Sequence, residues 1–135
     1  ELEKIAPEAA VCGYDPAVYE FHRRPPHIPD LIVSTDVLEH IEPDKLDAVL
    51  DDIAEMTKGP AFFVISTAKA KAILPDGRNA HLIIEQEPFW RERLAARWGD
   101  IIKIDRRQYS DIAFFVKSKI GPALTWPSGG DTIPL

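Results

Sequence analysis

The sequence predicts an α/β fold with a mostly parallel sheet that ends in an antiparallel pair of strands. Two observations carry this prediction. Apolar runs at 31–33 and 61–67 are each followed by a segment with helical periodicity, which is the order of parallel strands joined by helices. The last two apolar runs, 101–107 and 111–117, are separated only by a short polar turn, which predicts an antiparallel hairpin.

The clearest single element is a helix that begins at Pro43 and ends before Gly59. Its apolar residues recur at i, i+3, i+4, i+7 and i+10 and therefore share one face. They are Leu46, Val49, Leu50, Ile53 and Met56. Proline is favoured at the first position of a helix, and the Gly-Pro pair at 59–60 favours its end.

A second helix is predicted to open at Glu87 and to end at Gly99, after a long loop whose turn lies at 75–77. Trp90 and Trp98 lie at helical spacing along it. We expect both tryptophans in the core rather than on a surface that stacks against a substrate.

Composition and charge narrow the classes of function. The chain has 135 residues, a net charge of −6 and one cysteine, so it carries no disulfide framework. The acidic balance argues against a nucleic-acid module held by phosphate contacts, and no apolar run approaches the roughly 18 residues that a membrane span needs. We expect a cytoplasmic protein with an α/β domain at 1–119 and an extended, glycine- and proline-rich tail at 120–135 that packs on the domain or on a partner.

The residues that follow each predicted strand are the first functional candidates, because open α/β sheets bind ligands at the carboxyl ends of their strands. A short strand predicted at 11–15 ends in Asp15. A carboxylate at this place can accept hydrogen bonds from the ribose hydroxyls of a nucleotide-like cofactor. The Asp15-Pro16 pair also fits an ordinary turn with no ligand.

Two carboxylates and two imidazoles form the second candidate. Asp36, Glu39 and His40 follow the strand at 31–33, and in a helical turn they stand at i, i+3 and i+4 and project from one face. His81 lies in the loop after the next strand. Loops that follow adjacent parallel strands leave from the same edge of a sheet, so we expect all four side chains to lie together.

Such a cluster supports two chemistries. The two carboxylates and the imidazole of His40 can hold a divalent cation, or His40 or His81 alone can take the proton from an attacking oxygen or nitrogen near neutral pH. A structural interpretation also stands. Asp36 and Glu39 then cap the turn, and the histidines are side chains satisfied by backbone hydrogen bonds.

Residues 30–43 read Asp-Leu-Ile-Val-Ser-Thr-Asp-Val-Leu-Glu-His-Ile-Glu-Pro and resemble the fourth-strand motif of class I S-adenosylmethionine-dependent methyltransferases. The other elements between 11 and 119 agree with that family in order. The resemblance implies a Rossmann-like sheet and transfer of the methyl group of S-adenosylmethionine to an oxygen or nitrogen of a small or medium-sized acceptor. It also implies roles for single residues: Asp15 on the cofactor ribose; Thr35, Asp36, Val37 and Leu38 along the cofactor; and Glu39, His40 and His81 facing the acceptor.

The Asp-x-x-Glu-His run at 36–40, with a later histidine, is similar to the metal site of small-RNA 2′-O-methyltransferases and of ubiquinone-pathway O-methyltransferases. Those enzymes carry Glu-x-x-Glu-His, so Asp36 stands here in place of the first glutamate, with a shorter side chain. The resemblance makes His81 the candidate distant ligand of a divalent metal ion.

The glycine-rich loop that follows the family's first strand has no counterpart, because no Gly-x-Gly pattern occurs and only ten residues precede Val11. That strand lies at the centre of the family's sheet, so we expect either a fragment of a longer methyltransferase or a natural truncation. The strands at 11–15 and 31–35 then pair directly, or an N-terminal segment or a protein partner completes the sheet. The alternative function is a non-catalytic module of methyltransferase fold that serves in binding or assembly.

Overall fold

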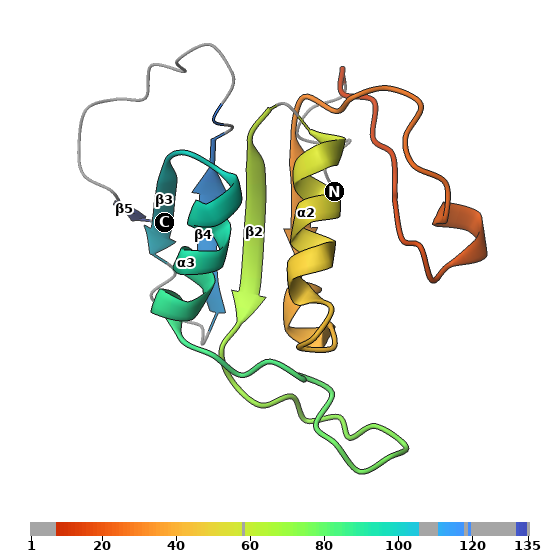
Figure 1. Ribbon diagram of the computed structural model, residues 1–135, viewed down its shortest axis with the longest axis vertical. Helices are drawn as coiled ribbons and strands as arrows, with labels where there is room; N and C mark the ends of the chain where they lie inside the picture. The colour runs from red at the N-terminus through yellow and green to blue at the C-terminus, as the bar shows by residue number, and fades with distance from the viewer. Residues whose placement is uncertain (1–7, 58, 106–110, 118, 120–131, 135) are drawn as a thin grey trace.

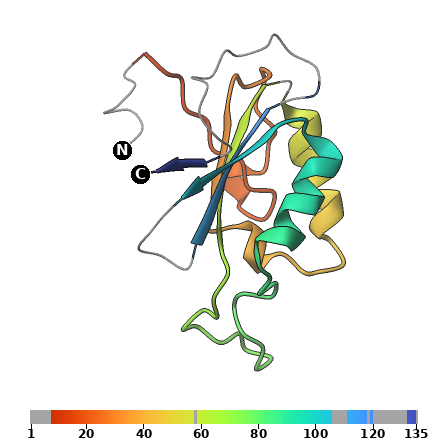
Figure 2. The ribbon, with the colours of Figure 1, turned by 90° about the vertical axis from the view of Figure 1, so that its left-hand side faces the viewer.

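The computed structural model describes residues 8–57, 59–105, 111–117, 119 and 132–134. Two α-helices lie side by side on one face of a twisted sheet (Figure 1, Figure 2). The helices are α2 (Leu46–Met56) and α3 (Glu87–Arg97); the strands are β1 (Ile32–Thr35), β2 (Ala61–Ser66), β3 (Ile101–Asp105), β4 (Asp111–Val116) and β5 (Thr132–Pro134); two short 3₁₀ turns are η1 (Tyr19–Phe21) and η2 (Leu38–His40).

The sheet is mixed, with the strand order β1-β2-β4-β3-β5. β1 pairs parallel with β2, and β5 pairs parallel with β3, whereas β4 pairs antiparallel with both β2 and β3. The predicted antiparallel pairing of the last two apolar runs, now β3 and β4, is confirmed. The prediction of a mostly parallel sheet is wrong, because β4 lies between β2 and β3 and makes antiparallel pairs along both of its edges.

The chain before β1 corrects a second prediction. Residues 11–15 form no strand but an irregular segment that leads into a turn. Asp15 closes this turn, since its Oδ1 accepts a hydrogen bond from Ala17 N at 2.9 Å. Pro16 has no N–H to give to a strand ladder, which favours the turn. Direct pairing with 31–35 therefore does not occur, and β1 is the last strand on this side of the described sheet.

The core fills the space between the sheet and the two helices. α2 contributes Leu50 and α3 contributes Trp90, and both side chains are fully buried. Phe63 of β2 packs edge-on against Trp98, with ring centroids 5.3 Å apart. Because Trp90 and Trp98 are 0% and 2% exposed, the prediction that they belong to the core is confirmed.

Most of the predicted tail at 120–135 falls outside the described residues. The part that is described, β5, joins the sheet beside β3, where Ile133 lies opposite Ile104 in register. None of the described helices has the length and apolar character needed to cross a membrane.

Candidate functional site

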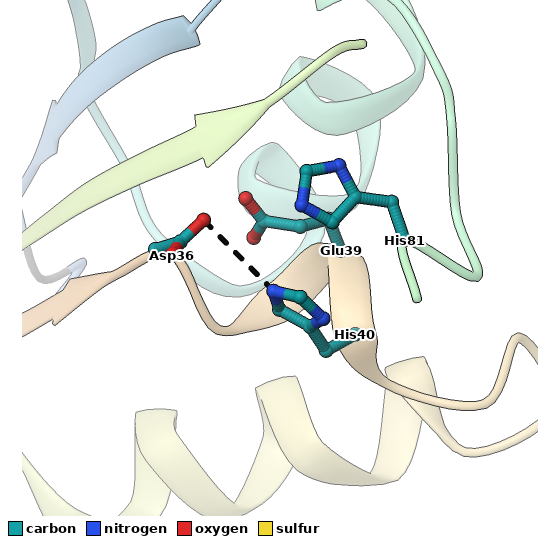
Figure 3. A group of neighbouring side chains, drawn as sticks. All are labelled: Asp36, Glu39, His40 and His81. Carbon is teal, nitrogen blue, oxygen red and sulfur yellow. Dashed lines mark ion pairs between the residues drawn. The ribbon is translucent and has the colours of Figure 1, made fainter. Parts of the chain in front are cut away.

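Asp36, Glu39, His40 and His81 converge at the carboxyl ends of β1 and β2 (Figure 3). Each of these residues offers one ligand atom, and these four atoms all lie within 4.8 Å of one another. The first three residues follow β1, and His81 comes from the loop after β2. The prediction that the four side chains lie together is therefore confirmed. We refer to them below as the edge cluster.

The backbone reaches this arrangement through a left-handed residue rather than through a continuous helical turn. Asp36 has a φ of 58°, a conformation that aspartate tolerates better than most residues. Its N–H still donates to the carbonyl of Val64 at 3.0 Å, so the residue stays tied to β2 while the chain reverses into η2. The expected helical turn over 36–41 is thus reduced to the single 3₁₀ turn at Leu38–His40.

Glu39 is the most constrained member of the edge cluster. Its side chain is 0% exposed, and Oε1 accepts a hydrogen bond from Ser66 N at 2.6 Å. Oε2 is buried without a hydrogen-bond partner. Burial raises the pKa of this carboxyl group, and the nearby charge of Asp36 raises it further. Burying a carboxylate oxygen without a hydrogen-bond partner is costly, so the position of Oε2 lowers the free energy of unfolding.

Both imidazoles are oriented by backbone carbonyl groups. Nδ1 of His40 lies 2.9 Å from the carbonyl oxygen of Ala80, and Nδ1 of His81 lies 2.6 Å from that of Ala68. A carbonyl oxygen only accepts, so Nδ1 carries the proton in each ring and Nε2 of the neutral ring has a free lone pair. Figure 3 shows the remaining ring nitrogen of each histidine on the side of the carboxylates.

The two rings are close to each other and to the carboxylates. Their centroids are 4.7 Å apart at an interplanar angle of 81°. Nε2 of His40 lies 3.9 Å from Oδ1 of Asp36, whose side chain is largely exposed. The edge cluster therefore runs from the buried carboxylate of Glu39 to solvent at Asp36.

A hollow of about 320 Å³ adjoins the edge cluster. It shares Asp36 and Glu39 with the cluster and extends across the ends of three strands. Its lining residues are Thr35, Asp36, Glu39, Val64, Ser66 and Asp111. Five of these six residues carry a hydroxyl or carboxylate group, so polar groups are available to a molecule bound in the hollow.

The residues predicted along a cofactor are not gathered in one place. Thr35 and Asp36 line the hollow, Val37 is 44% exposed, and Leu38 is buried in the core. Asp15 lies in the exposed turn before η1, where its carboxylate is engaged with Ala17 N. Their assignment to a cofactor stays a prediction.

Sequence reasoning missed Asn79, which binds the backbone on both sides of the loop that carries His81. The only signal in the sequence is its place two residues after the turn at 75–77, where asparagine often bonds to nearby backbone groups.

No family model matches the sequence, and no curated protein matches it either. One solved structure that is similar is magnesium protoporphyrin IX methyltransferase from Synechocystis PCC 6803, with bound SAH. The identity is 14% and the TM-score is 0.45, over 67% of this chain and 45% of that chain. The chain therefore spans less than half the length of that structure.

Proposed function

We propose that the chain is a methyltransferase-like α/β domain whose edge cluster binds a divalent transition-metal ion at the place where a methyl acceptor is held. The observation that supports a metal ion is the state of Glu39, a fully buried carboxylate with one oxygen that has no hydrogen-bond partner. A cation between this oxygen and the two imidazoles would offset the cost of burying it.

The donor set fits such an ion. Two imidazole nitrogens and two carboxylates suit Zn²⁺, Mn²⁺ or Fe²⁺ better than Ca²⁺ or Mg²⁺, which prefer oxygen ligands alone. Histidine ligands commonly donate their second ring N–H to a carbonyl oxygen, which fixes the tautomer and the ring orientation. His40 and His81 both do so. These hydrogen bonds hold both rings in the tautomer that leaves Nε2 free to bind a metal ion.

The methyltransferase half of the proposal rests on the sequence motif at 30–43. Methyl transfer from S-adenosylmethionine is an in-line displacement: the acceptor atom bonds to the methyl carbon, the carbon–sulfur bond breaks, and S-adenosylhomocysteine leaves. The protein mainly positions the two reactants and removes the acceptor proton. When bound, a metal ion supplies Lewis acidity that lowers the pKa of an acceptor hydroxyl.

The chain's own residues have distinct parts in this scheme. Thr35 and Ser66 line the hollow that would receive the acceptor, beside Glu39. Without a metal, His40 or His81 would take the acceptor proton through the free Nε2. The assignment of Asp15, Thr35, Asp36, Val37 and Leu38 to the cofactor rests on the resemblance alone.

A non-catalytic binding or assembly module is the second candidate. The observation that favours it is the irregular structure at 11–15, where the methyltransferase interpretation requires a strand that presents Asp15 at the sheet edge. In this module the edge cluster would be a structural metal site, and the edge of β1 that pairs with no other strand of the described sheet would receive the partner.

The metal proposal is tested by calorimetric titration of the chain with Zn²⁺ and, separately, Mn²⁺. We expect one ion per chain. His81→Ala should weaken binding more than about tenfold, because it removes a ligand whose ring is already oriented by its hydrogen bond to the carbonyl oxygen of Ala68. His27→Ala is the matched control, since His27 is exposed in the segment before β1 and should leave binding unchanged. Equal binding by wild type and His81→Ala, or no binding by wild type, would contradict the proposal.

A further inference from the structure

The loop between β2 and α3 is held in shape by the side chain of Asn79. Its Oδ1 accepts hydrogen bonds from Ala70 N and His81 N, each at 3.0 Å. Its Nδ2 donates to the carbonyl oxygen of Ala70 at 2.9 Å. One amide therefore ties the outgoing side of the loop, at residue 70, to the returning side, at residues 79–81.

This tie helps to position two carbonyl groups, together with the backbone hydrogen bond from Ala80 N to the carbonyl oxygen of Ala72 at 3.1 Å. Ala68 is two residues before Ala70, and its carbonyl oxygen accepts the Nδ1 proton of His81 at 2.6 Å. Ala80 follows Asn79 directly, and its carbonyl oxygen accepts the Nδ1 proton of His40 at 2.9 Å. Both carbonyl groups that orient the imidazoles of the edge cluster thus lie within two residues of a group that Asn79 binds.

We propose that Asn79 is a positioning residue of the edge cluster, which sets the tautomer and orientation of His40 and His81 without touching the bound ion. This inference rests on the proposed metal site. Loss of a group that orients a metal ligand typically lowers metal affinity about 10- to 100-fold. A residue that only stabilised the loop would instead change the melting temperature and leave both the affinity and the tautomers as they are.

Three variants separate these roles. Asn79→Ala removes all three hydrogen bonds. Asn79→Asp keeps a side-chain acceptor for the N–H groups of Ala70 and His81 but places an oxygen against the carbonyl oxygen of Ala70, so we expect an intermediate effect. Lys71→Ala is the matched control, because Lys71 is exposed in the same loop.

The experiment measures Zn²⁺ affinity of the folded chain by calorimetry. It also records the ¹⁵N shifts of the imidazoles by NMR, at a fixed pH where the rings are neutral. We expect Asn79→Ala to bind Zn²⁺ about 10- to 100-fold more weakly than wild type, with Lys71→Ala within about twofold of wild type. In the metal-free spectra, both rings of wild type should carry the proton on Nδ1, and Asn79→Ala should show a mixture of tautomers. If Asn79→Ala does not fold, Asn79→Asp serves for both comparisons.

The outcomes distinguish this inference from the proposed function. If wild type binds Zn²⁺ and Asn79→Ala binds equally well, Asn79 is not a positioning residue and the metal site stands. If wild type binds no Zn²⁺, the proposed metal site fails, and the spectra alone decide the role of Asn79. A mixture of tautomers in the variant would then support the inference, and unchanged tautomers would overturn it.

Discussion

Replacing Glu39 with glutamine tests the edge cluster through protein stability. The substitution keeps the size of the side chain and an oxygen that can accept the hydrogen bond from Ser66 N. It removes the negative charge that burial disfavours. We therefore expect the metal-free variant to be at least as stable as wild type and to have lost its response to metal.

The size of the expected stabilisation follows from the coupling of metal binding to folding. A ligand present at 100 times its Kd stabilises the folded state by about 2.7 kcal/mol. For a chain of this size, each kcal/mol shifts the melting temperature by about 4 °C, so wild type should gain about 10 °C. Glu39→Gln should gain no more than about 2 °C at the same metal concentration, because the remaining donors no longer include the buried anion.

Thermal unfolding followed by tryptophan fluorescence provides the assay, since Trp90 and Trp98 are buried in the core and report its loss. Glu92→Gln, at an exposed position on α3, is the matched control and should respond to metal as wild type does. Two results would refute the reasoning. One is an equal gain for Glu39→Gln and wild type. The other is a metal-free Glu39→Gln that is less stable than wild type by more than about 2 kcal/mol, which would give the carboxylate a structural role instead.

Three further predictions concern the core, the pH dependence of stability and the cofactor. Leu50→Ala should destabilise the fold by about 2–5 kcal/mol in chemical denaturation. Asp51→Ala should cost less than about 1 kcal/mol, because it removes one exposed carboxylate from Arg97, which keeps its contacts with Asp47; equal losses would contradict the described α2. The hydrogen bond from Lys103 lowers the pKa of Glu87, so this pair stabilises the protein above the usual glutamate pKa and loses that effect as the pH falls through the lowered value. Glu87→Gln should therefore make stability less sensitive to acid, by up to about 1 kcal/mol between neutral and acidic pH, whereas an unchanged slope would refute the pairing. Calorimetry should find that this chain binds S-adenosylmethionine weakly or not at all, and a micromolar Kd, about −8 kcal/mol, that Asp15→Ala weakens would show instead that the ribose contact is in place.

The elements that the sequence predicts well are those with local signals. The spacing of Leu46, Leu50 and Met56 places α2, although the helix begins at Leu46 and not at Pro43, because residues 43–45 form a separate turn in which Lys45 N bonds to the carbonyl of Glu42. The hairpin of β3 and β4 is likewise local. The pairing of β4 with β2 has no local signal, since strand order depends on pairings between residues far apart in the sequence.

The predicted strand at 11–15 does not form, because its end is taken up in a local turn: Asp15 N bonds to the carbonyl of Phe21, and Asp15 Oδ1 accepts from Ala17 N. The edge cluster was predictable because β1 and β2 are adjacent and parallel, so the chains that leave them start at one edge. The detailed geometry of the edge cluster cannot be predicted from the sequence. The left-handed Asp36 and the bonds of Asn79 to Ala70 depend on backbone conformations that no residue pattern specifies.

X-ray absorption spectroscopy of the Zn²⁺-loaded chain tests the central claim most directly, because it reports the atoms bound to the ion. The account predicts a first shell of nitrogen and oxygen atoms at about 2.0–2.2 Å with the outer-shell signature of two imidazoles, and with one imidazole fewer in His81→Ala. A first shell of oxygen atoms alone, or a spectrum that His81→Ala leaves unchanged, would contradict it.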